Sequence, residues 1–179
     1  MNNSYVRLWE QKYSIENTFE IELYNLSGKI PSQIFKLRNL RFLKLKGGSL
    51  NGSIPSGISN LNQLTHLDLS FNSLEGPIPP KLFHIKKLRT LNLESNKLSG
   101  FLPLEIKFLE NASYLNISNN GITGNFPDEI SALKKIWYIN FSNNNLSGHL
   151  SEELIRYISE RKLPIKNFID GNKINVSNC

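Results

Sequence analysis

The feature that most constrains the fold is a short phrase that returns at a fixed distance along the chain. Its glycine recurs at a constant interval, at Gly28, Gly52, Gly76, Gly100, Gly124 and Gly148, and we call this spacing the glycine grid. A leucine or isoleucine stands two residues before each glycine, and a proline stands three residues after the first five. A constant period of this length, built as L-x-x-L-x-L-x-x-N-x-L, indicates a solenoid of stacked coils without insertions.

Paired apolar residues before each glycine predict one short strand per coil. Leu67 and Leu69 alternate with polar residues, as do Leu91 and Leu93. Side chains alternate between the two faces of a strand, so the leucines point inward and the polar residues outward. Stacking of the coils then places these strands in one parallel sheet.

An asparagine four residues before the glycine predicts how the following turn is stabilised. It occurs in four coils, as Asn72, Asn96, Asn120 and Asn144. Its amide can satisfy backbone groups that would otherwise be buried without partners. Tyr24 and Gly48 hold this position in the first two coils, so we expect the ladder to be absent there. The Ile-Pro pair that follows the first three glycines sends the chain extended toward the outer face.

The carboxyl-terminal segment departs from the repeat. Ser151 replaces the proline and can cap a helix over 151–162, with Glu152 and Glu153 at its positive end and Arg161 and Lys162 at its negative end. The sequence LPIKNFID, residues 163–170, stays on the glycine grid and predicts a seventh, partial strand. Terminal repeats of solenoids are commonly atypical.

The motifs L-S-G-K-I-P, L-N-G-S-I-P and L-E-G-P-I-P resemble the plant-type leucine-rich repeat family over residues 19–158. The resemblance implies an α/β solenoid: a right-handed superhelix with a parallel concave β-sheet and short 3₁₀ or irregular convex turns. It divides the chain into an amino-terminal cap (1–18), six repeats (19–158) and a carboxyl-terminal cap (159–179). Family members usually open with a cysteine-paired cap, whereas Trp9 stands here without cysteines.

The period also identifies the outward-facing strand positions, where the resemblance implies that partners bind. Three columns are expected on the concave face, ten, eight and six residues before the glycines. The first contains Thr18, Phe42, His66, Thr90, Tyr114 and Tyr138, continued by Lys162; the second Glu20, Lys44, Asp68, Asn92, Asn116 and Asn140; the third Glu22, Lys46, Ser70, Glu94, Ser118 and Ser142. The Asp or Asn followed by Leu-Ser is usual for the family and favours a structural role.

The aromatic column is the main candidate for partner binding. Phe42, His66, Tyr114 and Tyr138, with Trp137 beside them, would expose apolar area on the concave sheet. Aromatic residues at such positions commonly anchor protein partners. The alternative is that neighbouring rings pack on one another for stability.

Lys44 and Lys46 place two ammonium groups on one face of the second strand. Receptors of the family can hold a peptide's terminal carboxylate with paired arginines, which these lysines resemble in charge and spacing. The alternative, which we favour, is cross-strand ion pairing with Glu20 and Glu22, worth about 0.2–1 kcal/mol for exposed groups.

Charge and chemistry exclude several function classes. The net charge is +6, but the cations are spread along the chain without the aromatic interleaving of RNA-binding proteins, so we expect no nucleic-acid partner. His66, His84 and His149 are too separated on the grid to share a metal, and Cys179 has no cysteine to pair with. We expect no cofactor and no catalytic site.

These observations predict a non-catalytic module that recognises a protein or peptide through its concave face. Two alternatives stay open: an inhibitor of a secreted cell-wall-degrading enzyme and an intracellular leucine-rich repeat scaffold. The resemblance implies an extracellular or cell-surface location. The opening MNNSYVRLWEQKYS lacks the apolar core of a signal peptide, which favours the scaffold.

Overall fold

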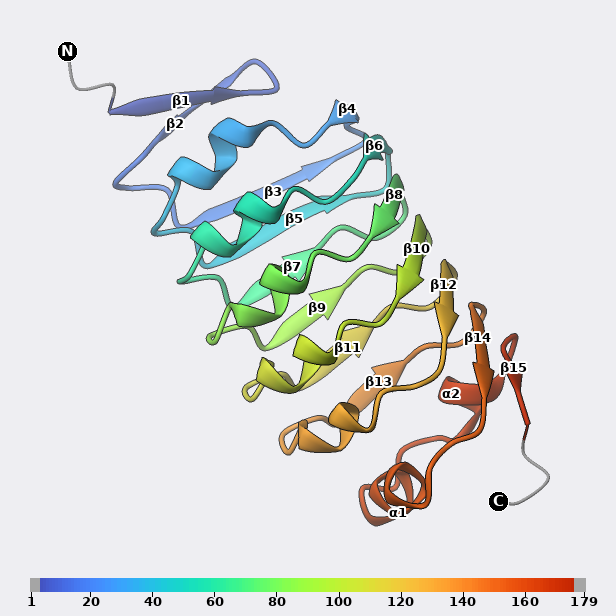
Figure 1. Ribbon diagram of the computed structural model, residues 1–179. Helices are drawn as coiled ribbons and strands as arrows, with labels where there is room; N and C mark the ends of the chain where they lie inside the picture. The colour runs from blue at the N-terminus through green and yellow to red at the C-terminus, as the bar shows by residue number, and fades with distance from the viewer. Residues whose placement is uncertain (1–3, 176–179) are drawn as a thin grey trace.

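The protein, described by a computed structural model over residues 4–175, is a solenoid with strands on its concave side and short helices on its convex side (Figure 1). The concave sheet has six parallel strands in chain order. They are β3 (Glu20–Tyr24), β5 (Phe42–Lys46), β7 (His66–Asp68), β9 (Thr90–Asn92), β11 (Tyr114–Asn116) and β13 (Tyr138–Asn140).

A second parallel sheet runs along the edge where each concave strand has turned (Figure 1). Its seven strands are β4 (Ser27–Lys29), β6 (Ser49–Gly52), β8 (Ser73–Pro77), β10 (Lys97–Phe101), β12 (Gly121–Gly124), β14 (Asn145–Gly148) and β15 (Lys173–Ile174). The sequence predicted one sheet, because a three-residue phrase such as Leu-Ser-Gly has too few residues to show an alternating pattern. Stacking at a constant period nevertheless brings these segments within hydrogen-bonding distance.

Within residues 4–175, the convex side contains five 3₁₀ helices, in agreement with the short 3₁₀ or irregular turns that the resemblance implied. They are η1 (Ser32–Lys36), η2 (Ser56–Asn60), η3 (Pro80–His84), η4 (Leu104–Phe108) and η5 (Asp128–Ala132). The residue before each helix is the repeated proline, and its backbone is extended. Proline suits this boundary because it lacks an N–H that would need a partner.

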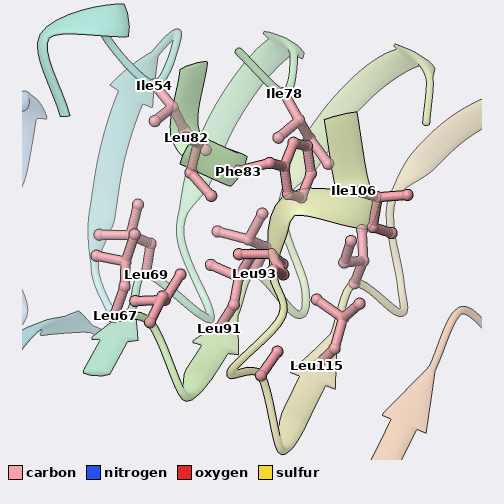
Figure 2. Packing of buried hydrophobic residues seen from close by; sticks show 14 of the residues in the cluster. Ile54, Leu67, Leu69, Ile78, Leu82, Phe83, Leu91, Leu93, Ile106 and Leu115 are labelled. Carbon is pink, nitrogen blue, oxygen red and sulfur yellow. The ribbon is translucent and has the colours of Figure 1, made fainter. Parts of the chain in front are cut away.

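The core is one continuous cluster between the sheets and the 3₁₀ helices (Figure 2). Leu67, Leu91 and Leu115 are adjacent in the concave sheet and are 0% exposed. Leu82 and Phe83 close the coil from the convex side and are also fully buried. The inward positions predicted by the period are therefore confirmed in the central coils.

The predicted asparagine ladder is present in coils three to six. The Asn120 amide donates to the carbonyls of Leu93 at 3.0 Å, Ile117 at 3.1 Å and Ser118 at 3.1 Å, and its Oδ1 accepts from the N–H of Leu98 at 3.0 Å. Equivalent bonds surround Asn72, Asn96 and Asn144. Each asparagine thus joins its own turn to the preceding coil.

The first coil does not follow the grid. In the sheet, Phe42 pairs with His66, which lies one full period further along the chain. Glu20 pairs with Phe42 and Tyr24 pairs with Lys46, and both separations are two residues shorter than a period. The turn after β3 is shorter by those two residues, so the asparagine position does not exist there and is not filled by Tyr24. A Cβ on Gly48 would lie 2.4 Å from the Leu26 carbonyl oxygen, so the second coil needs glycine at its asparagine position.

We expect these two coils to open first. The turns of coils one and two lack a ladder asparagine, and stability in a solenoid depends on contacts between neighbouring coils. In native-state hydrogen exchange, the amides of β7, β9 and β11 should be the best protected, and those of β3 and β5 less protected. Equal protection of 20–46 and 66–116 would contradict this expectation.

The carboxyl-terminal cap departs from the sequence prediction in one element. Helix α1 (Glu152–Glu160) forms, and Ser151 caps it by accepting from the N–H of Leu154. Residues 163–170 do not form a strand, because they contain α2 (Lys166–Ile169). Asn167 lies across the edge of β13. Its side-chain amide donates to the Ile139 carbonyl at 2.8 Å, and its backbone carbonyl accepts from the N–H of Phe141 at 2.7 Å.

The ladder resumes after α2, but later than the grid predicts. Leu146 donates to Asn172 Oδ1, 26 residues away, whereas Ile122 donates to Asn144 across 22 residues. Helix α1 replaces the shorter 3₁₀ helix of the other coils, and the sixth coil is longer as a result. The seventh strand is β15 in the second sheet.

A hairpin stands at the amino-terminal end of the solenoid. It consists of the antiparallel strands β1 (Tyr5–Leu8) and β2 (Gln11–Ser14), and β1 lies against η1. Val6 and Leu8 are buried there, and Trp9 is partly buried. Cys179 lies outside the described residues. Within 4–175, the helices are too short to span a bilayer.

Candidate concave binding surface

The structure places the predicted columns on the concave face in coils two to six. Phe42, His66, Thr90, Tyr114 and Tyr138 are neighbours in register along the sheet. The two ends of that column need correction. Because β3 is displaced, Glu20 lies beside Phe42 in place of Thr18, which is buried. Lys162 follows helix α1 and does not lie on a concave strand.

Three predicted aromatic residues come together near the carboxyl-terminal end of the sheet. The rings of Tyr114 and Tyr138 are stacked, with centroids 4.6 Å apart and planes 9° apart. The Trp137 ring lies 6.0 Å from Tyr114 and 6.1 Å from Tyr138. Trp137 is 68% exposed, whereas the tyrosines are half-buried. We call these three residues the aromatic platform.

The aromatic platform combines apolar rings with polar edges. Burial raises the pKa of the Tyr114 phenol above its ordinary value, at which this hydroxyl is already protonated at physiological pH. Tyr138 accepts at its hydroxyl from the Asn140 amide, at 3.4 Å. Ring area bordered by uncharged polar groups suits a protein or peptide partner.

The remaining predicted aromatics form a separate pair. The rings of Phe42 and His66 have centroids 5.2 Å apart. His66 Nδ1 also lies 2.9 Å from the Thr65 hydroxyl. Thr90 separates this pair from Tyr114, so the aromatic column is interrupted in the middle of the sheet.

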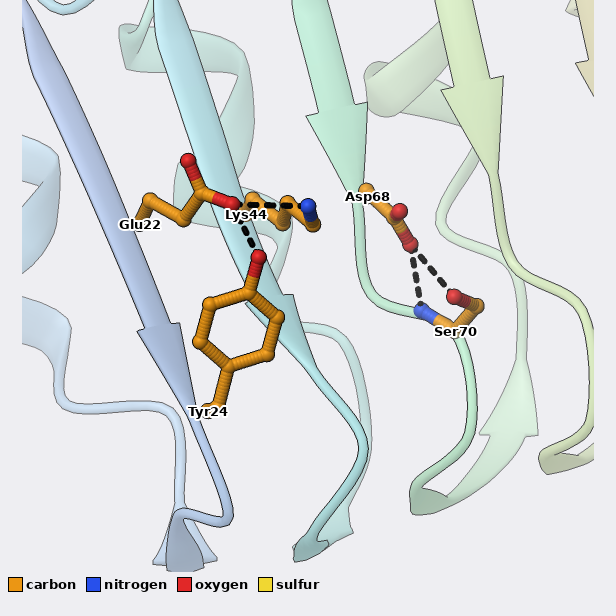
Figure 3. A network of polar contacts seen from close by, with 5 residues as sticks. All are labelled: Glu22, Tyr24, Lys44, Asp68 and Ser70. Carbon is orange, nitrogen blue, oxygen red and sulfur yellow. Dashed lines mark hydrogen bonds and ion pairs between the residues drawn. The ribbon is translucent and has the colours of Figure 1, made fainter.

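The two lysines of β5 have different surroundings. Lys44 Nζ lies 2.7 Å from Glu22 Oε1, which also accepts from the Tyr24 hydroxyl (Figure 3). The hydrogen bond from Lys44 is the main cause of the lowered pKa of Glu22. Lys46 Nζ instead lies 5.2 Å from the centre of the Phe71 ring. The cross-strand ion pair favoured by the sequence is therefore present for Lys44.

Two residues that the sequence columns missed lie beside these lysines. Tyr24 is 50% exposed, and its ring centre lies 4.9 Å from Lys44 Nζ. Its place on the face depends on the displacement of β3, which the glycine grid does not reveal. Phe71 has φ +57°, a region that strongly disfavours bulky residues, and is 44% exposed.

The Asp or Asn column supports the turns, as the sequence favoured. Asp68 Oδ1 accepts from the Ser70 N–H at 2.9 Å and from its hydroxyl at 2.6 Å (Figure 3). Asn116 accepts in the same way from both groups of Ser118. Within residues 4–175, no cluster of three or more His, Cys, Asp and Glu side chains could hold a metal ion.

Comparisons with known proteins agree with this architecture. The Leucine Rich Repeat family model matches residues 63–85, 87–109, 111–133 and 135–156, together about half of the chain. A comparison with curated proteins found no match.

Solved structures give closer parallels. The plant peptide hormone receptor RGFR1, in complex with RGF2, is 38% identical over 73% of this chain, with a TM-score of 0.70. The Arabidopsis receptor kinase HAESA, with the peptide hormone IDA and the co-receptor SERK1, is 33% identical over 77%, with a TM-score of 0.73. A plant ice-binding protein is 30% identical over 87%, with a TM-score of 0.71.

The lengths of these proteins differ from that of the chain. The chain spans 21% of the RGFR1 chain, 23% of the HAESA chain and 50% of the ice-binding protein. The repeat match, the stacked coils and the asparagine ladder agree, and the chain belongs to the leucine-rich repeat family, with plant receptor ectodomains among its structural neighbours.

Proposed function

We propose that this chain is a non-catalytic module that recognises a protein or peptide through its concave face. The observation that carries the proposal is the aromatic platform of Tyr114, Tyr138 and Trp137. Its rings are held by strand pairing and by one another, yet Trp137 remains largely exposed. Aromatic anchors that are already ordered lose little conformational entropy when a partner covers them.

The structural neighbours support this proposal without deciding it. RGFR1 and HAESA are described in complex with peptides, RGF2 and IDA. The same fold also occurs in an ice-binding protein, so the fold alone does not specify a ligand. The proposal therefore rests on the concave side chains of this chain. An inhibitor of a secreted cell-wall-degrading enzyme and an intracellular scaffold are the alternative uses of such a face.

The platform has a defined place on the face. Tyr114 lies on β11 and Tyr138 on the adjacent strand β13, about 4.8 Å away. Trp137 immediately precedes β13. Phe42, His66, Lys44 and Lys46 lie toward the other end of the sheet and extend the proposed surface. A bound peptide that runs along the sheet can contact both regions.

The proposal is tested by changing Tyr114 and Tyr138 together to Ala. Peptides are first selected from a displayed random library on the immobilised chain, and their affinities are then measured by calorimetry. The double variant should lose more than about 2 kcal/mol of binding free energy, the usual mark of a hot spot. Its melting curve should stay close to that of the parent.

Phe101→Ala is the matched control. Phe101 is 71% exposed, but it lies on β10 in the second sheet. It should leave the affinity of concave ligands nearly unchanged. Concave recognition would be the wrong assignment if Phe101→Ala weakened binding as much, or if the tyrosine pair affected stability alone.

A further inference from the structure

Seven of the 21 lysines and arginines, although they look dispersed in the sequence, lie along one edge of the solenoid. This edge consists of the loops between the 3₁₀ helices and the concave strands, residues 37–41, 61–65, 85–89, 109–113 and 133–137 (Figure 1). These loops contain seven basic residues and one acidic residue, Glu110. The basic edge comprises Arg38, Arg41, Lys86, Lys87, Arg89, Lys134 and Lys135, all exposed.

Within residues 4–175, no cation of the basic edge forms an ion pair within salt-bridge distance, although Lys134 shares a depression with Glu153 and Glu160. Among residues 4–175, the ion pair within salt-bridge distance is Lys44 with Glu22, which lies on the concave face. Lys87 and Lys135 donate to neutral amides of the preceding coil, Gln63 at 2.5 Å and Asn111 at 2.6 Å. These bonds orient the ammonium groups and leave their charge available. A surface with an excess of positive charge attracts an oppositely charged ligand.

The charges recur in every second coil. Arg38 and Arg41 precede β5, Lys86, Lys87 and Arg89 precede β9, and Lys134 and Lys135 precede β13. The loops before β7 and β11 contain Asn62, Gln63 and Thr65, and Glu110, Asn111 and Ser113. The intervening coils therefore contribute mainly amides and hydroxyls.

The spacing between the cationic coils follows from the backbone. The Thr65 N–H donates to the Arg41 carbonyl at 2.8 Å, and the Arg89 N–H donates to the Thr65 carbonyl at 2.8 Å. The distance between neighbouring strands, about 4.8 Å, is therefore kept between neighbouring coils at this edge. Cationic coils are consequently about 9.6 Å apart along the solenoid.

This distance matches one turn of a polyproline II helix. That helix has three residues per turn and rises about 3.1 Å per residue, so every third side chain returns to the same face after about 9.3 Å. An acidic residue at every third position would bring three carboxylates opposite the three cationic coils. Proline-rich segments are already extended and lose little entropy on binding.

Two local features fit such a ligand. Arg89, Asn111, Ser113 and Lys135 line a shallow depression that offers two cations, an amide and a hydroxyl. The exposed Trp137 ring stands at the carboxyl-terminal end of the edge, and aromatic surfaces are the usual contact for prolines in such segments. We propose that the basic edge binds an acidic, proline-rich protein segment in the polyproline II conformation, with Asp or Glu at every third residue.

Two nine-residue peptides of identical composition test the register. One is PPEPPEPPE, with its glutamates on one face, and the other is EPPPEPPPE, with its glutamates turned to three different faces. Calorimetry at low and high salt should show that the first binds about tenfold more tightly at low salt, with the difference shrinking as salt rises. Equal affinity of the two peptides would overturn the proposal in favour of diffuse charge attraction.

Two matched protein variants locate the site. Lys86→Gln with Arg89→Gln removes two charges from the middle cationic coil and should weaken PPEPPEPPE about tenfold. Lys97→Gln with Lys173→Gln removes the same charge from β10 and β15 in the second sheet and should do much less. Similar melting temperatures verify that both variants are folded. An equal effect of the two pairs would overturn the assignment.

Other polyanions provide the last comparison. A nine-nucleotide single-stranded DNA and an oligouronate are titrated under the same conditions. If either binds more tightly than PPEPPEPPE, the edge serves a different class of polymer and the proposal fails. Because these variants and probes spare the tyrosines of the concave face, failure here leaves the proposed concave recognition independently testable.

Discussion

Leu91→Lys is expected to leave the chain unfolded at room temperature. Leu91 is 0% exposed and lies between Leu67 and Leu115 in the concave sheet. An ammonium group there would be surrounded by leucine side chains, without a carboxylate or carbonyl that the packing leaves free. Burying an ammonium group, or removing its proton to bury it, costs several kcal/mol, and the lost leucine packing adds to this, so the total is comparable with the roughly 5–15 kcal/mol that stabilise a typical domain. Circular dichroism should show no cooperative melt.

Two further substitutions separate charge burial from local disruption. Leu91→Ala should stay folded but lose about 2–5 kcal/mol, because it removes buried methyl groups and leaves a cavity. Thr90→Lys changes the adjacent residue, which is half-exposed on the concave face, and should retain a cooperative melt. A parent-like melt for Leu91→Lys would show that the inward and outward positions are misassigned.

The second large effect is expected for Asn120→Ala. Its side chain donates to the carbonyls of Leu93, Ile117 and Ser118 and accepts from Leu98 N–H. Alanine would leave these four backbone groups without that partner in a region that water reaches poorly. Each unsatisfied buried group costs about 1–3 kcal/mol, and partial rehydration should limit the total to about 3–5 kcal/mol.

Denaturant unfolding, followed by circular dichroism, measures this loss. Asn145→Ala is the control, because Asn145 is an exposed asparagine on β14. It should change the free energy of unfolding by less than about 0.5 kcal/mol. A similar loss for both variants would mean that the ladder does not stabilise the coils. Hydrogen exchange should place the Asn120→Ala defect in the two coils that this side chain joins.

The sequence by itself determined the repeating part of the protein. The glycine grid located the concave strands of coils two to six and the ladder from Asn72 to Asn144, and the family resemblance implied the 3₁₀ or irregular turns of the convex side. The sequence also identified Ser151 as the cap of α1. These features could be predicted because each of these coils lies one full period from at least one neighbour. A constant period therefore implies a constant register.

Only the tertiary structure decided what happens where a neighbour is missing or different. The first coil lacks two turn residues, so β3 is displaced and Tyr24 reaches the concave face. At the other end, Phe168 packs against Phe126 and Phe141, with ring centroids 5.6 and 5.7 Å apart. That packing accompanies α2 in a segment whose spacing predicted a strand. An end coil contacts only one neighbouring coil and a cap, so its register depends on how it packs against them.

The candidate surfaces divide in the same way. The sequence placed Tyr114 and Tyr138 in one column, but their stacking and the position of the Trp137 ring depend on the geometry of adjacent strands. The basic edge was not predicted, because its cationic loops lie two full repeats apart along the chain. Coiling turns each repeat of sequence separation into a distance of about 4.8 Å. Residues remote in sequence become neighbours because each coil returns the chain to the same edge.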